Sequence, residues 1–328
     1  MTSKKYQIIA IGECLLDVFA TKSQDGESML MEGKPGGAPV NVLAQSTKLG
    51  LKTAYISKIS DDPLGLFLKS KLDEAGIDTS GVVVTKDYPT TLALVSLDRS
   101  GNRSFKFYRE KTADIMLSKD EIDYGLLQNA QVFHFGSVSM TTEPSRSATF
   151  AAASKAKDLG LLISFDPNLR IPLWQDLEAA RDNIIKGLKL SDVVKVSDDE
   201  LIFITGHSDI EKGAKELAEK FELSLLAVTL GPKGCLCYAN NTSVQELTYN
   251  VKTVDTTGAG DSFWGAMLYS LISNNKEITE YSAEELRELI RFSNAAGSLT
   301  TTRTGAINAM PEKESILNCI KNVPYLTP

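Results

Sequence analysis

The chain has 328 residues, of which 42% are hydrophobic and 23% are charged, and its formal net charge is −7. This composition predicts a folded protein with a substantial core and excludes an intrinsically disordered chain. The acidic balance and the lack of a long basic run argue against a nucleic-acid partner, because such partners require clustered lysine and arginine.

The N-terminal residues contain only a short apolar run, 8–11, before Gly12 and Glu13. A secretory signal or a membrane span needs a longer apolar stretch, so we expect cytoplasmic residence and no membrane partner. The cysteines form no CxxC pair and are predicted to be reduced packing residues. They are Cys14, Cys235, Cys237 and Cys319.

Two segments in the N-terminal half look like hairpins, namely residues 17–32 and 90–109. The second has a turn at 99–102 between extended stretches at 91–97 and 103–108. Together the hairpins predict a small sheet outside the main one. We therefore expect one domain, residues 1–328, with lid segments at 13–33 and 87–112 inserted in it.

From about residue 125 onward, strand-like and helix-like segments alternate. This alternation predicts a doubly wound α/β fold with a mainly parallel sheet flanked by helices. His134 falls in one of the strands, where a core residue is a better interpretation than a metal ligand. The strand-like segments are 130–135, 161–165, 192–196 and 225–230, and the helix-like segments are 147–159, 176–190 and 210–221.

A glycine-rich loop follows residues 251–255, which have extended character, and precedes the apolar stretch 262–272. Gly258, Ala259 and Gly260 therefore fall at a predicted helix N-terminus. Unpaired backbone N–H groups and the helix dipole favour an anion there, and small residues let phosphate oxygens approach the backbone. Such a loop can hold a transferring phosphoryl group.

Asp261 stands in the first turn of this predicted helix, beside the anion site. Its carboxylate can accept a proton from a hydroxyl that is aligned with the γ-phosphate of ATP. The alternative is that Asp261 only caps the helix while the glycines form a tight turn.

Residues 255–268 resemble the C-terminal signature of the ribokinase-like, or PfkB-type, carbohydrate kinases. Residues 36–42, Gly-Gly-Ala-Pro-Val-Asn-Val, resemble the N-terminal glycine-rich signature of that family. The resemblance implies a large α/β domain and a small β lid that closes over a sugar. The chain has no GxxxxGK[ST] loop and no HRD-like loop at either histidine, which argues against other kinase designs.

Glu200 is the leading candidate for organising Mg²⁺, because kinases neutralise polyphosphate charge with a metal held by waters and a few carboxylates. The family commonly carries Asn-x-x-Glu here, and Ser197 replaces the usual Asn as the candidate nucleotide-side contact. The alternative is an acidic helix start capped by Ser197. For a monovalent cation such as K⁺, the resemblance implies Asp255, Thr257 and residues 302–305.

Residues 229–234 follow a predicted buried strand and by themselves form only a turn. By resemblance, they flank the phosphates and ribose of ATP, with Thr229, Gly231 and Gly234 as candidate contacts. The resemblance also implies that Asn294, on a later helix, lies near the adenine.

A polyhydroxyl substrate needs carboxylate and amide partners, and the N-terminal half supplies Asp17 after a buried strand and Asn41 beside Gly36 and Gly37. The resemblance assigns Asp17, Gly37 and Asn41 to sugar hydroxyls. The alternatives are a strand-end turn residue for Asp17 and a helix cap for Asn41.

A finer resemblance, spanning nearly the whole chain, is to bacterial and plant fructokinases. It implies that Arg109 and Arg170 hold phosphate or carboxylate oxygens and that Asn168 steadies the phosphoryl group. It also implies that Phe105 and Phe107 lie on a lid strand with one face toward the sugar. Surface or structural pairing is the alternative for both arginines. The matching segments are 36–39, 105–109, 134–137, 165–170, 173–174, 300–302 and 305–307.

The expected activity is transfer of the γ-phosphate of ATP to the 6-hydroxyl of D-fructose, an ATP:sugar phosphotransferase reaction with Asp261 as the base. Within the same family, 2-keto-3-deoxygluconate and ribose are alternative acceptors. An alternative of another class is a non-catalytic sugar-sensing or scaffolding protein. The intact residues 258–261 and Glu200 count against it. An unsatisfied edge of the small sheet predicts a homodimer that forms through the lid.

Overall fold

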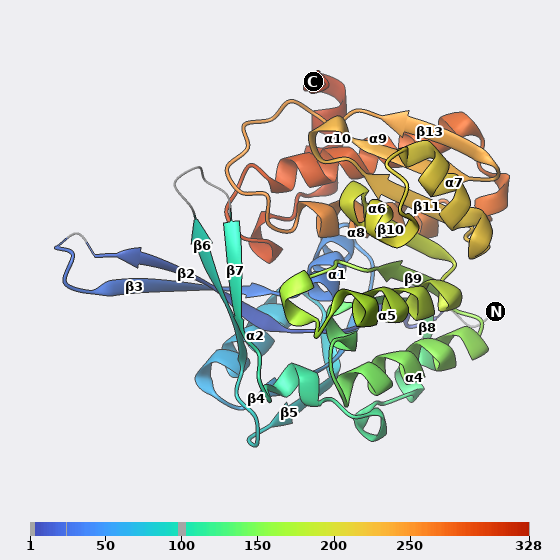
Figure 1. Ribbon diagram of the computed structural model, residues 1–328. Helices are drawn as coiled ribbons and strands as arrows, with labels where there is room; N and C mark the ends of the chain where they lie inside the picture. Colours follow the sequence, from blue (N-terminus) through green and yellow to red (C-terminus); the bar gives the residue numbers. More distant parts are fainter. Residues whose placement is uncertain (1–3, 24, 98–102, 328) are drawn as a thin grey trace.

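The computed structural model describes residues 4–23, 25–97 and 103–327, which build two sheets and the helices around them (Figure 1). The main sheet has the order β13-β12-β11-β10-β9-β8-β1-β4-β5. Its pairs are parallel except for β11 with β12 and β12 with β13. The strands are β1 Tyr6–Ile11, β4 Thr53–Ser60, β5 Asp78–Thr85, β8 Ala130–Gly136, β9 Leu162–Asp166, β10 Val193–Ser197, β11 Leu225–Thr229, β12 Cys235–Ala239 and β13 Thr242–Glu246.

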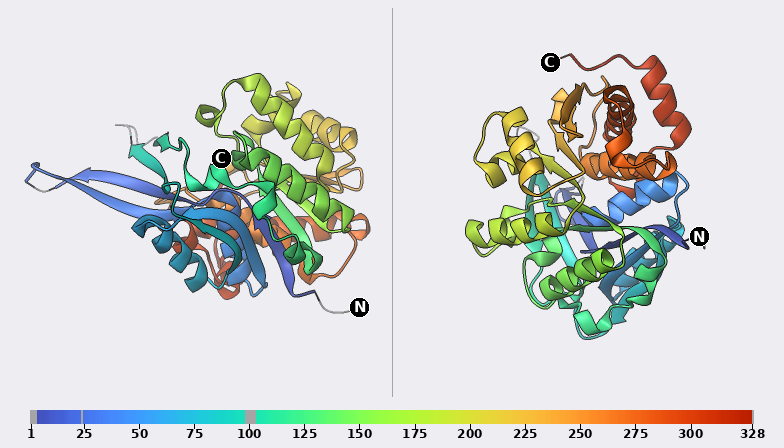
Figure 2. Two further views of the ribbon diagram at one scale, coloured as in Figure 1. Left: turned by 90° about the horizontal axis from the view of Figure 1, so that it is seen from below. Right: turned by 90° about the vertical axis from the view of Figure 1, so that its right-hand side faces the viewer.

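Helices cover both faces of the main sheet, as the views in Figure 2 show. Helices α4 to α7 pack against one face, and α1, α2, α8 and α9 pack against the other, with α10 on α9. The helices are α1 Ala38–Lys48, α2 Pro63–Glu74, α3 Gly125–Gln128, α4 Ser145–Asp158, α5 Leu177–Leu190, α6 Asp198–Thr205, α7 Ile210–Lys220, α8 Ala259–Ser273, α9 Ala283–Thr300 and α10 Lys313–Asn322.

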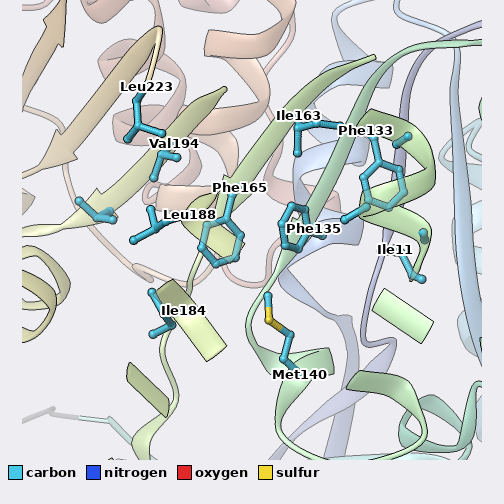
Figure 3. Close-up of a cluster of buried hydrophobic side chains, with 14 of the residues drawn as sticks. Ile11, Phe133, Phe135, Met140, Ile163, Phe165, Ile184, Leu188, Val194 and Leu223 are labelled. Carbon is cyan, nitrogen blue, oxygen red and sulfur yellow. The ribbon is translucent and has the colours of Figure 1, made fainter. Parts of the chain in front are cut away.

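A cluster of buried hydrophobic side chains fills the space between the sheet and the first helix layer (Figure 3). Phe135 of β8 stacks on Phe165 of β9 with the ring centroids 4.7 Å apart. Ile184 and Leu188 of α5 belong to the same cluster. Parallel strands buried on both faces are rich in apolar residues, which is why the alternating segments could be located from the sequence.

The second sheet has four strands in the order β3-β2-β6-β7 and projects from the body of the molecule (Figure 1). β2 (Leu15–Lys22) and β3 (Met29–Gly36) form an antiparallel hairpin, and β6 (Thr91–Leu97) and β7 (Arg103–Tyr108) also pair antiparallel. β2 joins the two hairpins by pairing in parallel with β6. The turn expected at 99–102 lies outside the described residues.

The strands and helices predicted between residues 130 and 230 are confirmed, and their bounds shift by no more than two residues. The helix predicted over 262–272 is also present, but it begins three residues earlier, at Ala259. Residues 251–255, expected to be extended, contain no strand. All four cysteines are free and buried, as predicted. Within the described part of the chain, no helix has the length and apolar character needed to cross a membrane.

Candidate active site

A cavity of about 420 Å³ lies where β1, β9, β10 and β11 of the main sheet end. Loops at the carboxyl ends of parallel strands are the usual place for ligands in open α/β sheets. Second-sheet residues also reach this first cavity, since Leu15 and Asp17 of β2 and Phe107 of β7 line it. Its walls therefore come from both sheets.

The predicted anion loop lies at the start of α8. Gly258 is the N-cap residue and has φ 76°, a left-handed conformation that suits glycine. The carboxylate of Asp255 fixes the loop, because Oδ1 accepts the backbone N–H of Thr257 at 2.7 Å and Oδ2 accepts that of Gly305 at 3.0 Å. Backbone N–H groups at this helix start favour an anion.

Asp261 is the third residue of α8, and its side chain lines the first cavity. It does not cap the helix, because its oxygens accept hydrogen bonds from side chains far away in the sequence. Oδ2 accepts from Nδ2 of Asn41 at 2.8 Å, and Oδ1 accepts from Nδ2 of Asn168 at 3.3 Å.

Burial and the negative charge of Asp166 raise the pKa of Asp261 to about 6, although Asn41 and Lys195 act in the opposite direction. A carboxyl with this pKa is largely ionised at neutral pH and still basic enough to accept a proton.

Lys195 and Asp166 were not among the predicted site residues, although Lys195 lines the first cavity. Nζ of Lys195 lies 2.6 Å from Oδ2 of Asp166, and both side chains are buried. Burial lowers the pKa of Lys195, but the charges of Asp166 and Glu200 outweigh it and raise the pKa overall. Oδ1 of Asp166 accepts the backbone N–H of Asn168 at 3.1 Å, so the pair also fixes the residue that contacts Asp261.

Glu200 lies in the first turn of α6, and both of its oxygens accept backbone N–H groups. Oε1 accepts from Leu169 at 2.6 Å and Oε2 from Ser197 at 2.8 Å, while Oγ of Ser197 accepts the N–H of Glu200. The alternative of a capped helix start is thus correct for Ser197. Both residues also line the first cavity.

The described residues contain no cluster of three or more His, Cys, Asp and Glu side chains that could enclose a metal. Mg²⁺ is commonly held through waters, one or two carboxylates and substrate phosphates, and does not need such a cluster. Glu200 lines the same cavity as Gly258 and Gly260 of the anion loop and fits this kind of site. Asp255 and Thr257 lie on the loop itself, where the monovalent cation was predicted.

The glycine turn at Gly36 and Gly37 precedes α1 and packs against Glu13 in the wall of the first cavity. Gly37 has φ 127°, and a Cβ atom on it would lie 2.3 Å from the carbonyl oxygen of Glu13, so only glycine fits. Gly36 is the last residue of β3. The alternatives for two predicted sugar contacts are wrong, because Asp17 lies inside β2 and Asn41 lies inside α1, where Gly37 is the N-cap residue.

Glu13 is a third site residue that was not predicted from the sequence. It is buried, it lines the first cavity, and its Oε1 accepts the backbone N–H of Ala38 at 2.8 Å. No group of the described residues donates to Oε2. Burial raises the pKa of Glu13 to about 7 despite the hydrogen bond from Ala38.

Of the two predicted arginines, only Arg170 lines the first cavity. The Arg109 side chain is buried and bound elsewhere, with Nε 2.8 Å from Oδ2 of Asp114 and Nη1 donating to the carbonyl of Val138 and to Thr141. Arg109 is therefore engaged in structural pairing, which was the alternative to a role in binding phosphate or carboxylate oxygens. The side chain of Phe105 lies outside the described part of the structure.

A second cavity of about 290 Å³ lies on the other side of the anion loop. Its lining includes the predicted nucleotide-side residues Gly231, Gly234 and Asn294. Thr229, Thr256 and Gly260 line both cavities. Two ligands can therefore meet at the anion loop, one from each side.

Comparisons with known proteins agree with this arrangement. The model of the pfkB family carbohydrate kinases matches residues 5–313. The chain is 41% identical to a probable fructokinase-2 of Arabidopsis thaliana over 316 residues, which is 96% of this chain and 95% of that protein.

Two solved structures illustrate the structural likeness. The fructokinase of Xylella fastidiosa with bound ATP has a TM-score of 0.89 and 32% identity, covering 97% of this chain and 98% of that one. The fructokinase of Vibrio cholerae O395 in its fructose, ADP and calcium ion bound form has a TM-score of 0.85 and 31% identity, covering 96% of this chain and 99% of that one.

Proposed function

This chain belongs to the pfkB family of carbohydrate kinases, and from that premise we propose that it is an ATP-dependent fructokinase. The predictions of the family and of the ribokinase-like α/β fold are confirmed. The proposed reaction transfers the γ-phosphate of ATP to the 6-hydroxyl of D-fructose, with ADP as the leaving group.

One observation carries this proposal, namely that the two cavities share the anion loop. A sugar in the first cavity and a nucleotide in the second would meet at Gly260, next to the carboxylate of Asp261. In-line phosphoryl transfer needs this arrangement of acceptor, phosphate and donor.

In the proposed mechanism, Asp261 takes the proton of the 6-hydroxyl while that oxygen bonds to the γ-phosphorus. The bond between this phosphorus and the bridging oxygen of ADP breaks at the same time. Backbone N–H groups of Gly258 and Gly260 stabilise the negative charge on the transferring group. The N–H of Ala259, the third predicted donor, already donates to the carbonyl of Thr256 at 3.3 Å. Asn41 and Asn168 hold the carboxylate of Asp261 in place.

Mg²⁺ supplies charge neutralisation for the polyphosphate of ATP when it is bound. Glu200 would orient it, through water since both carboxylate oxygens already accept backbone N–H groups. For K⁺, the proposed ligands lie on the loop that Asp255 braces against Gly305.

A coupled assay of ADP release tests the acceptor. We expect the highest kcat/KM on D-fructose among fructose, ribose and 2-keto-3-deoxygluconate, with Asp261→Asn as the inactive control. Absence of turnover on fructose, together with clear turnover on another sugar, would contradict the proposal.

The rival acceptor 2-keto-3-deoxygluconate carries a carboxylate, for which Arg109 and Arg170 were the predicted partners. Because Arg109 is already bound to Asp114, one arginine is left for that role. Fructose has no carboxylate and does not need a second arginine, so the ion pair between Arg109 and Asp114 favours fructose as the acceptor. A sugar-binding protein without catalysis would bind fructose and release no ADP with saturating Mg-ATP.

We propose further that the second sheet is a lid of a single domain and that it mediates a homodimer. Met29, Leu30 and Met31 of the edge strand β3 are 61%, 59% and 67% exposed. An exposed apolar edge strand favours pairing with another chain. Light scattering should give the mass of a dimer, and Met31→Lys should lower it to that of a monomer. The cytoplasmic location stays a prediction.

A further inference from the structure

The C-terminal segment after α10 does not trail into solvent but returns to the nucleotide side of the molecule. The carbonyl of Pro324 accepts the backbone N–H of Asn250 at 2.9 Å, and the N–H of Leu326 donates to the carbonyl of Thr248 at 2.8 Å. These bonds flank an antiparallel bridge between Tyr249 and Tyr325.

Two sets of contacts stabilise the bridge, one between the tyrosine rings and one between residues 247–248 and α9. The rings of Tyr249 and Tyr325 lie with their centroids 5.2 Å apart, a distance typical of favourable aromatic pairs. On the other side, the hydroxyls of Thr248 and Ser298 lie 2.7 Å apart, and Nδ2 of Asn294 donates to the carbonyl of Leu247 at 3.1 Å. The C-terminal segment is therefore tied through residues 247–250 to α9.

This bracing places Leu326 in the lining of the second cavity. Pro232, Val251 and Phe263 line the same cavity and share its apolar character, whereas Gly260 and Thr256 lie at the anion loop. Leu326 does not line the first cavity. Leu326 enters the lining next to Thr248, to whose carbonyl its N–H donates. Its apolar side chain suits the face of a heterocyclic base and has no donor for a phosphate oxygen.

We propose that Leu326 is a wall of the base subsite and that the C-terminal segment determines affinity for the nucleoside part of the phosphate donor. The proposal rests on the proposed function, since it takes the second cavity as the nucleotide site. The bridge between Tyr249 and Tyr325 acts as a positioning contact that holds Leu326 in this place.

The test is titration calorimetry of the full chain with ADP and, separately, with inorganic tripolyphosphate, without sugar. Leu326→Ala should weaken ADP binding by about fivefold to thirtyfold, the range for losing most of one leucine contact. Binding of tripolyphosphate should not change, because it has no base. Leu326→Met, which keeps the apolar volume, should restore most of the ADP affinity.

Leu317→Ala is the matched control, because Leu317 of α10 is 50% exposed and does not line the cavity. It should bind ADP like the wild type. A chain shortened to end at Pro324 should match or exceed the loss seen with Leu326→Ala.

Wild-type ADP affinity in Leu326→Ala would overturn the inference, and so would an equal loss for ADP and tripolyphosphate. These outcomes leave the proposed function intact. Conversely, a wild-type chain that binds ADP through Leu326 and phosphorylates no sugar would support the base subsite while refuting the fructokinase proposal.

Discussion

The amide of Asn41 lies 2.8 Å from the carboxylate of Asp261, although the two residues are 220 positions apart in the chain. Asn41 belongs to the helix after the glycine turn, and Asp261 to the helix after the anion loop. The hydrogen bond therefore joins the two family motifs at one carboxylate. It stabilises the ionised form of Asp261, which is the form a general base needs.

Replacement of Asp261 by asparagine should lower kcat by about 10²–10⁴-fold, because the base is lost while the size of the side chain is kept. In the wild type, kcat/KM should rise with pH through about 6, the pKa of Asp261, and level off above it. Initial rates between pH 5 and 8.5 check both points. Near wild-type turnover in Asp261→Asn would contradict the role of base.

Asn41→Ala should move the acid limb of the pH profile to higher pH. Its amide lowers the pKa of Asp261, so removing it lets burial and the charge of Asp166 raise that pKa further. The pH at half-maximal kcat/KM is the measurement, since a purely structural defect would lower the rate without moving that pH. Asn183→Ala, at a buried asparagine of α5 outside both cavities, is the control.

The sequence was sufficient to predict the fold and the anion loop, because both depend on local patterns. Buried parallel strands are apolar runs, and the helix start after Gly258 is marked by the residues around it. The relationship between Asn41 and Asp261 could be expected only from the resemblance, since it depends on how α1 and α8 pack.

The missed residues show where sequence reasoning fails. A lysine between Val194 and Val196 in a buried strand was a visible signal, but its partner Asp166 lies on a neighbouring strand. The predicted role of Arg109 in holding phosphate or carboxylate oxygens was wrong for a similar reason, because its partner could not be identified from the sequence. Asp114 is only five residues away, but nothing in the sequence indicates that a turn brings the two side chains together.

Lys195→Met should destabilise the protein by about 3–5 kcal/mol, because it leaves the carboxylate of Asp166 buried without its cation. Adding Asp166→Asn removes the buried, unpaired carboxylate charge, so the double variant should be more stable than Lys195→Met alone. Urea unfolding gives the free energies for the double-mutant cycle. Strictly additive losses would show that the two side chains do not act as a pair.

Glu13 should make the stability of the protein depend on pH. Its pKa is about 7 in the folded protein, against an ordinary value of 4.5, so the folded state holds a proton that the unfolded state has released. The contribution is fully present below about pH 4.5 and is lost as the pH rises through 7. The loss should be about 3 kcal/mol.

Glu13→Gln should remove this dependence, because glutamine keeps an oxygen that can accept the N–H of Ala38 and carries no charge. The difference in unfolding free energy between the wild type and this variant isolates Glu13 from Asp261, whose raised pKa acts in the same direction. Urea titrations at pH 5, 6, 7 and 8 should show that the unfolding free energy of Glu13→Gln increases relative to that of the wild type as the pH rises. Glu178→Gln, at an exposed glutamate of α5, should follow the wild type throughout. If Glu13→Gln also ran parallel to the wild type, the Glu13 carboxyl would have to be ionised in the folded protein across this range.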